Sequence, residues 1–439
     1  MKKSLVALAT LAVAGGAMAQ VVISGRANLD VGGYSAVGAS GNSSIGAANQ
    51  VATPSTVDFA NRNVVRDASS RITLTVTEDI GGGLKAGLVC DTGINIDTAN
   101  QNGQANTANA NTGWFCTREG SVRFGTSTVE VRLGRQNVFW TSGAADVTGS
   151  NLVGSSISAN LYGGGVGLHG TRLPNMIMLY GGAGLGKFAN SSIYYGINSD
   201  GYGESSNNTA AANIGTGTQG TGTYNGFKLT YAITPTWEAM VDYQSSQNST
   251  GVGTAAVGTA GNTSSFNRTA TKYQLAWKYA GGESIASVQY WTKERTDLTA
   301  NALFSLPTLT GTAALGAGTA AANTAANQGS GKDSGYVFNI NHDFGDGYIG
   351  ALQYGQAYNM QGVQTANTAP TEIANSGATA YTVGGLMRMS KRTHLYAAYH
   401  VITNGVNAQY GMTGGNYQSS TAANGQQITT TAIGIQHWF

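Results

Sequence analysis

Hydrophobic and polar residues alternate along many segments of the chain. Near the start, Val21 and Ile23 fall on the opposite side of an extended backbone from Arg26. The same period of two recurs in residues 71–77 and 129–133. Because successive side chains of a strand point to opposite faces, this pattern predicts strands with one apolar and one polar face. Soluble β-sandwiches share it, so alternation alone leaves the architecture open.

Sixteen such segments can be placed, and the links between them alternate strictly between short and long. Residues 345–347 form a short link, whereas residues 196–223 form a long one rich in Gly, Asn, Thr and Ser. This predicts an all-β, sixteen-stranded antiparallel transmembrane β-barrel with short turns at one end and long loops at the other. The predicted strands are residues 21–32, 69–79, 84–91, 114–124, 129–136, 171–180, 188–195, 224–233, 237–243, 269–279, 284–293, 335–344, 348–358, 378–389, 393–401 and 426–439.

The final segment is the clearest predicted strand. Ile433 and Ile435 lie on one face with Phe439, whereas Gln436 and Trp438 lie on the other. Chain ends of soluble proteins usually fray, so an aromatic strand end is unusual there. In a bacterial barrel the last strand pairs with the first, and aromatic residues lie at the membrane interface.

The start of the chain has the pattern of a secretory signal peptide. A basic beginning and a short apolar run precede Ala17-Met18-Ala19, which is a small-x-small cleavage pattern. The apolar run is too short to cross ~30 Å of hydrocarbon as an anchor. We therefore expect a signal peptide at residues 1–19 and a single barrel domain at residues 20–439.

Composition is consistent with an exported barrel. Only 10% of the residues are charged, and no run of eighteen apolar residues follows the predicted signal, so no transmembrane helix is expected. A closed barrel can enter a membrane without one, because its strands average to near-neutral hydropathy. Removing Lys2 and Lys3 reduces the 23 basic residues to 21, equal to the 21 acids, which gives no indication of a nucleic-acid partner.

Four segments carry a more specific signal: residues 70–86, 131–136, 390–396 and 433–439. They resemble segments of the Gram-negative porin family, in its trimeric beta-proteobacterial form. The first resembles the second strand, first turn and third strand of that family, and the second resembles the strand that leads into loop 3. The third resembles its last periplasmic turn, and the fourth resembles its closing strand. The resemblance implies an outer-membrane channel for passive diffusion of ions and small hydrophilic solutes. It also implies a homotrimer in contact with outer-membrane lipid and lipopolysaccharide, and no cofactor.

The resemblance further implies that loop 3 folds into the lumen as a constriction, facing a ladder of basic residues that often gives anion preference. Loop 3 would be residues 137–170. It departs from the family pattern because Asp146 is its only acidic residue. The sequence therefore leaves the strength of charge selectivity open.

Alternation places further charged side chains toward the lumen. The inward set is Arg26, Asp30, Arg71, Lys85 and Arg132, in which basic residues predominate, so we expect a weak anion preference. Some of these charges would instead only pair with nearby acids. Arg118 and Arg135 have outward parity, but the resemblance favours a lumen position for Arg135 through a β-bulge. The candidate constriction residues are Arg26, Arg71, Lys85, Arg132, Arg135 and Asp146.

Cys90 and Cys116 fall near the outer ends of adjacent predicted strands. In an oxidising compartment they either form a disulfide across the second long loop or remain free thiols in the wall.

Other motifs indicate no chemistry. Residues 181–187 have the spacing of a phosphate-binding loop, but Phe188 replaces its Ser or Thr, so a glycine-rich turn is expected. The five histidines have no metal-ligand spacing, and no catalytic set is visible, so an enzyme is not expected. A solute-specific channel and an adhesin that acts through the long loops remain alternatives on the same barrel.

Overall fold

The structure is a computed structural model that describes residues 19–39, 58–67, 70–94, 96, 115–138, 172–197, 223–252, 263–278, 284–297, 330–359, 361, 372, 374–406, 408, 410–411 and 425–439. The predicted signal peptide lies outside these residues except for Ala19. Asp146 and the predicted loop 3 beyond Val138 also lie outside them.

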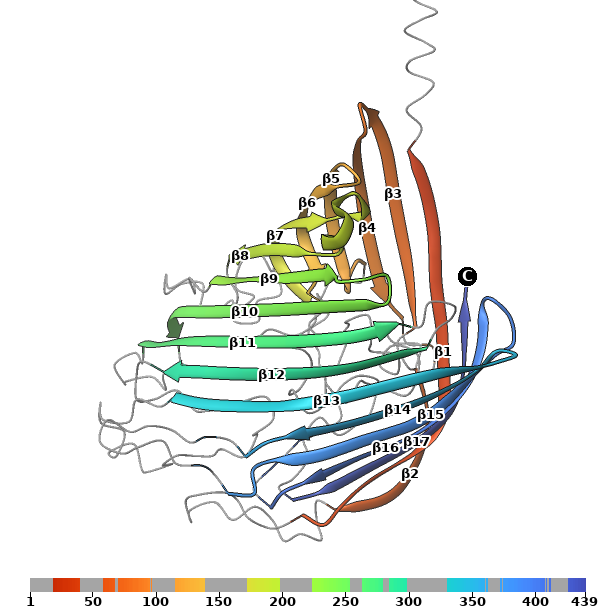
Figure 1. Ribbon diagram of the computed structural model, residues 1–439, viewed down its shortest axis with the longest axis vertical. Coiled ribbons are helices and arrows are strands. Elements are labelled where there is room, and N and C mark those ends of the chain that lie inside the picture. Colours follow the sequence, from red (N-terminus) through yellow and green to blue (C-terminus); the bar gives the residue numbers. More distant parts are fainter. Residues whose placement is uncertain are drawn as a thin grey trace, which may run out of the picture.

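Seventeen strand segments form one antiparallel sheet that closes on itself as a barrel (Figure 1). The segments are β1 (Gln20–Val37), β2 (Phe59–Asp67), β3 (Arg71–Gly81), β4 (Leu84–Gly93), β5 (Glu119–Gly125), β6 (Val129–Asn137), β7 (Arg172–Gly181), β8 (Ser192–Ile197), β9 (Thr223–Ala232), β10 (Trp237–Val252), β11 (Thr263–Lys278), β12 (Ile285–Asp297), β13 (Ser330–Gly345), β14 (Tyr348–Ala357), β15 (Ala378–Arg388), β16 (Thr393–Asn404) and β17 (Gln427–Trp438). Because β2 and β3 pair end to end with β1, they share one place in the wall, and the barrel has sixteen strands.

The barrel closes where β1 meets β17, which lie beside each other in Figure 1. At the end of this pairing, the Gly25 N–H donates to the Phe439 carbonyl at 3.1 Å, and the Phe439 N–H donates to the Gly25 carbonyl at 3.2 Å. A side chain at Gly25 would overlap the Phe439 ring, so glycine permits this close approach. Closure matters because hydrocarbon offers no hydrogen-bond partner to an open strand edge.

The wall carries apolar side chains on its outer face and polar side chains on its inner face, the reverse of the distribution in a soluble protein. Outward side chains such as Val288, Ile340 and Ile433 are apolar and exposed. Their inward neighbours Gln289 and Asn339 are polar and buried. This distribution matches a wall with hydrocarbon outside and a polar interior, as the alternation predicted.

The predicted strands are all present, with differences at a few boundaries. The predicted link over residues 33–65 contains the end of β1 and most of β2. The predicted strand at residues 114–124 begins only at Glu119. The link that follows β7 includes a 3-10 helix, η2 (Ala183–Phe188), so β8 starts at Ser192 and not at the predicted residue 188. None of the helices in the described part of the chain is long and apolar enough to cross a membrane.

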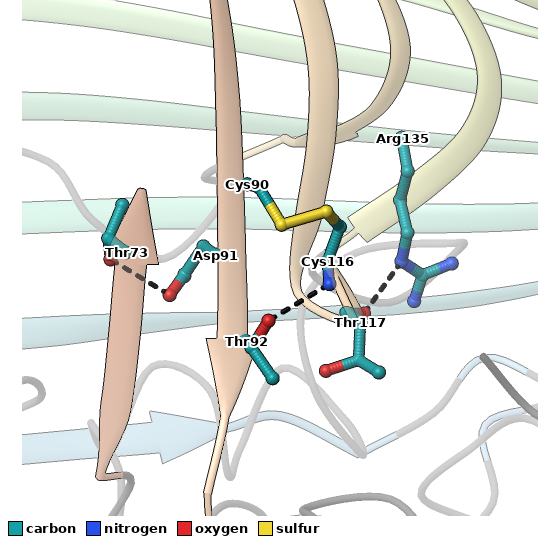
Figure 2. Close-up of a disulfide and its surroundings, with 7 residues drawn as sticks. All are labelled: Thr73, Cys90, Asp91, Thr92, Cys116, Thr117 and Arg135. Atoms are coloured by element: carbon teal, nitrogen blue, oxygen red, sulfur yellow. Dashed lines mark hydrogen bonds between the residues drawn. A yellow bond between two sulfur atoms is a disulfide. The ribbon is translucent and has the colours of Figure 1, made fainter. Parts of the chain in front are cut away.

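A disulfide joins β4 to the segment that precedes β5. Cys90 and Cys116 are bonded, with their Cα atoms 4.5 Å apart (Figure 2). The Cys116 N–H also donates to the Thr92 hydroxyl at 2.9 Å. A Cβ on Gly120 would lie 3.1 Å from the Cys116 Cβ, so the small residue leaves room for the bond. The disulfide therefore closes the second long loop at its base.

We expect a charge on the lipid-facing side of the wall to be costly. Ile340→Arg should lower the free energy of unfolding by ~2–4 kcal/mol if this position lies near mid-membrane. Urea unfolding of the protein refolded in lipid vesicles, read by heat-modifiable gel migration, measures this loss. Ile340→Leu is the control, and its unfolding midpoint should stay close to that of the wild type. Equal midpoints for the Arg and Leu variants would contradict the outward placement.

We also expect the disulfide to stabilise the barrel. Replacing both Cys90 and Cys116 by Ser removes a link between residues 26 positions apart, and should cost ~3 kcal/mol of unfolding free energy. Denaturant unfolding with and without a reductant measures the effect. The reductant should lower the midpoint of the wild type to that of the double variant and leave the double variant unchanged. An insensitive wild type would show that the link adds no stability.

Candidate functional site: the charged inner wall

The inner wall near the barrel closure carries two stacked arginines. Arg26 on β1 lies directly opposite Arg71 on β3 and Trp438 on β17. The guanidinium carbons of Arg26 and Arg71 lie 5.1 Å and 5.6 Å from the centre of the Trp438 ring. An indole face attracts cations, so Trp438 holds both guanidinium groups against the wall. The sequence predicted that Trp438 lies on the face opposite Ile433 and Ile435, but it did not indicate this role.

A third arginine joins the wall beside them. The Arg118 Nε donates to an Asp91 carboxylate oxygen at 3.0 Å, and the Thr73 hydroxyl donates to the other Asp91 oxygen at 3.1 Å. Figure 2 shows Asp91 turned toward Thr73 of β3. Arg118 lies just before β5, where the chain is not a regular strand, so the outward parity assigned to it does not apply.

Two further arginines oppose each other on β5 and β6. Arg123 and Arg132 are a register pair. Each is ion-paired with an acid on its own strand: Arg123 with Glu119 at 2.6 Å, and Arg132 with Glu130. The Arg132 guanidinium also lies 3.6 Å from the centre of the Tyr180 ring. These arginines are therefore largely neutralised, which corresponds to the pairing alternative that the sequence left open.

Asp30 belongs to a buried ion pair. Arg66 on β2 binds the Asp30 carboxylate, and both side chains are almost fully buried. The Tyr396 hydroxyl lies 3.0 Å from the second Asp30 oxygen and 2.9 Å from the Asn28 side-chain oxygen. A buried pair with these partners fixes the closure between β1, β2 and β16.

The remaining predicted residues lie apart from this group. Lys85 is exposed next to the tight turn at residues 81–83 and lies opposite Asp79. Arg135 lies where the β6–β7 register shifts between Gly134 and Gln136. Its Nε donates to the Thr117 carbonyl at 3.0 Å (Figure 2). A bulge thus occurs at Arg135, and the side chain binds the segment before β5.

About half-way round the ring, β9 to β11 carry a second charged group that the sequence analysis did not single out. Asp242 lies directly opposite Lys228 and Lys272. Asp242 and Lys272 are buried on the inward alternation, like Gln244 and Gln274 beside them. The signal that could have revealed this group is an acid and a base at matching positions of consecutive predicted strands.

The arrangement offers a charged, hydrogen-bonding interior and shows no catalytic geometry within the described part of the chain. No group of three or more His, Cys, Asp or Glu residues there could hold a metal ion. Residues 181–187 form the link from β7 to β8 with a 3-10 helix, not the strand, loop and α-helix of a nucleotide site. Such an interior can bind and orient passing solutes by charge and hydrogen bonds.

The Gram-negative porin family model matches residues 4–407 of the sequence. No curated protein sequence matches the chain. Among solved structures, the chain is similar to an anion-selective porin from Comamonas acidovorans, with 19% identity, a TM-score of 0.62, and coverage of 96% of this chain and 100% of that one.

Two more distant likenesses share the fold. OmpT of Vibrio cholerae is 11% identical, with a TM-score of 0.56 and coverage of 96% of this chain and 98% of that one. OmpF of Salmonella typhi is 12% identical, with a TM-score of 0.51 and coverage of 95% and 97%. Because the family model spans most of the sequence and the barrel has the expected closed form, this chain belongs to the Gram-negative porin family and forms a channel in the bacterial outer membrane.

Proposed function

We propose that the channel is a general diffusion pore with a weak preference for anions. The observation that carries this proposal is the group of Arg26 on β1, Arg71 on β3 and Arg118 just before β5, on the same part of the inner wall. Two acidic residues lie with this group. Asp91 accepts a hydrogen bond from Arg118, and the Asp67 carboxylate accepts the backbone N–H groups of Ser70 and Ile96. Among the described residues of this group, three positive charges therefore face two negative ones, which favours passage of anions.

The preference should be weak, because most other inward charges occur in opposite pairs. Arg123 and Arg132 each have an acidic partner on the same strand, and Lys293 is paired with Asp333 at 3.1 Å. The similar porin from Comamonas acidovorans is described as anion-selective, which supports the sign of the preference.

We also propose that the protein assembles as a homotrimer in contact with lipid and lipopolysaccharide. Family membership supports the trimer. Exposed tyrosines near the long-loop ends of β14 to β16 support the lipid contact, because tyrosine favours the interface between hydrocarbon and headgroups. They are Tyr354, Tyr358, Tyr381 and Tyr399.

A planar-bilayer recording in a KCl gradient tests the channel and its ion preference together. The wild-type protein should conduct, and its reversal potential should indicate a slight preference for chloride over potassium. Clear preference for potassium would overturn the anion assignment and leave the channel intact, whereas absence of conductance would contradict the channel itself.

Charge reversal tests the arginine group. Arg71→Glu should shift the reversal potential toward potassium, because it changes two unit charges beside Arg26. Arg132→Glu should shift it in the same direction. Lys391→Glu makes the same charge change on the exposed turn between β15 and β16, and it should leave the reversal potential unchanged. If neither arginine variant differs from the Lys391→Glu control, these side chains lie off the ion pathway.

The trimer has its own test. Unheated protein in mild detergent should have about three times the chain mass by light scattering corrected for bound detergent, as expected for a closed cyclic assembly. A monomer that still conducts would overturn the trimer and leave the channel proposal in place.

A further inference from the structure

The inner wall of β12 to β17 is apolar over part of its length, which is unexpected for a wet lumen. Trp291, Val337, Ile402 and Ile428 have inward parity and are each 0% exposed. They belong to one cluster of buried apolar residues with Ala357, Ala378 and Ala380. Burying such side chains is favourable only when something other than water covers them, so this wall needs a cover inside the barrel.

Part of that cover is the chain that follows β16. Ala408 and Tyr410 are 0% and 1% exposed and belong to the same apolar cluster. Because the cluster lies on the inward face, these two residues lie inside the barrel. The segment that starts at Gly405 therefore turns inward over the wall instead of continuing outward from the strand. We call the described residues Gly405, Val406, Ala408, Tyr410 and Gly411 the inward segment.

Hydrogen bonds fix the backbone of the inward segment. The Asn404 side chain accepts from the Tyr410 N–H at 2.7 Å and donates to the Tyr410 carbonyl at 3.0 Å. The same amide donates to the Gln426 carbonyl at 2.8 Å. The Gly425 N–H donates to the Ala408 carbonyl at 3.0 Å, so the segment is bonded to the end of β16 and to the residues just before β17.

The Tyr410 side chain reaches a charged pair on the wall. Its hydroxyl donates to Asp333 at 3.4 Å, and Asp333 is paired with Lys293 at 3.1 Å. Burial, together with the nearby Asp333 charge, raises the pKa of Tyr410 well above its usual value, so the phenol stays neutral and donates its proton. A Cβ at Gly335 would lie 2.6 Å from the Trp291 ring, so glycine there lets Trp291 lie flat along the wall.

We propose that the inward segment, anchored to the wall by Tyr410, narrows the pore and sets its size limit. It lies against the inner wall of β12 to β17, in a different part of the ring from Arg71 and Arg118. In this arrangement the arginine group acts on the charge of a solute and the inward segment acts on its size. This inference rests on the channel function and adds to it a residue that positions a constriction.

Removing the ring tests the proposal. Tyr410→Ala should raise the single-channel conductance and should admit larger neutral sugars in liposome-swelling assays with a graded series from pentose to trisaccharide. Tyr410→Phe keeps the ring and loses only the hydroxyl, so its conductance and size limit should stay close to the wild type. Tyr358→Ala removes an exposed tyrosine from the outer face of the rim and should change neither quantity.

A folded Tyr410→Ala channel with wild-type conductance and size limit would overturn the proposal, whereas a wild-type protein that does not conduct would contradict the channel function instead. Heat-modifiable migration confirms folding. If Tyr410→Ala does not fold, Val406→Cys provides the second test, because Val406 is an exposed residue of the inward segment and the described residues contain no free cysteine. A sulfonate-bearing and an ammonium-bearing thiol reagent should then shift its reversal potential in opposite directions. No shift with either reagent would also overturn the proposal.

Discussion

Hydrogen bonding of the backbone in a medium without water is the constraint on which this structure depends. Every peptide group that crosses the hydrocarbon needs a partner within the protein. A sheet meets this requirement only when its first and last strands pair, and here β1 pairs with β17 along most of their length. The buried pair of Asp30 and Arg66, with Tyr396 beside it, strengthens the wall at the closure. The tilt of the strands and the width of the lumen follow from this ring of sixteen.

The inverted wall explains how a chain with so few charges supports a polar passage. Outward positions such as Val288, Ile340 and Tyr354 are apolar or tyrosine, whereas buried charges such as Asp242, Lys272 and Lys293 are directed inward. Most of these charges occur as opposite pairs across or along strands, and such pairs limit the field inside the barrel. Arg26 and Arg71 also pack on the face of Trp438, which attracts cations without adding a negative charge. We propose that selectivity follows from the small excess of positive charge in this group.

Much of the fold could be predicted from the sequence, because the alternation of a barrel wall is a local signal. The strands from residue 335 to the last segment were predicted to within a few residues. β2 was missed because Asn63, Val64, Val65 and Arg66 do not alternate. Only its pairing with β1 identifies this segment as a strand. Alternation could not place Arg118, because parity fails where the chain leaves the strand before β5.

The inner wall was harder to predict, because its contacts join strands that are distant in sequence. Arg26, Arg71 and Trp438 meet only once the ring is closed. The pairing of Asp242 with two lysines depends on the register of three strands. The apolar cluster around Trp291 resembles a lipid-facing stretch in the sequence, since alternation gives two faces but does not say what covers each of them. Long-range register and loop placement are the information that the local pattern lacks.

The meeting of Gly25 and Phe439 has a consequence for how such a wall is made. The two residues are separated by more than 400 positions, so this contact has one of the largest sequence separations in the molecule. Until it forms, every partly built sheet has two open edges whose peptide groups can pair with any other extended chain. Assembly therefore requires protection of those edges, in the aqueous compartment, for as long as the ring is incomplete. The same bonds that seal the finished wall make its precursors prone to aggregate.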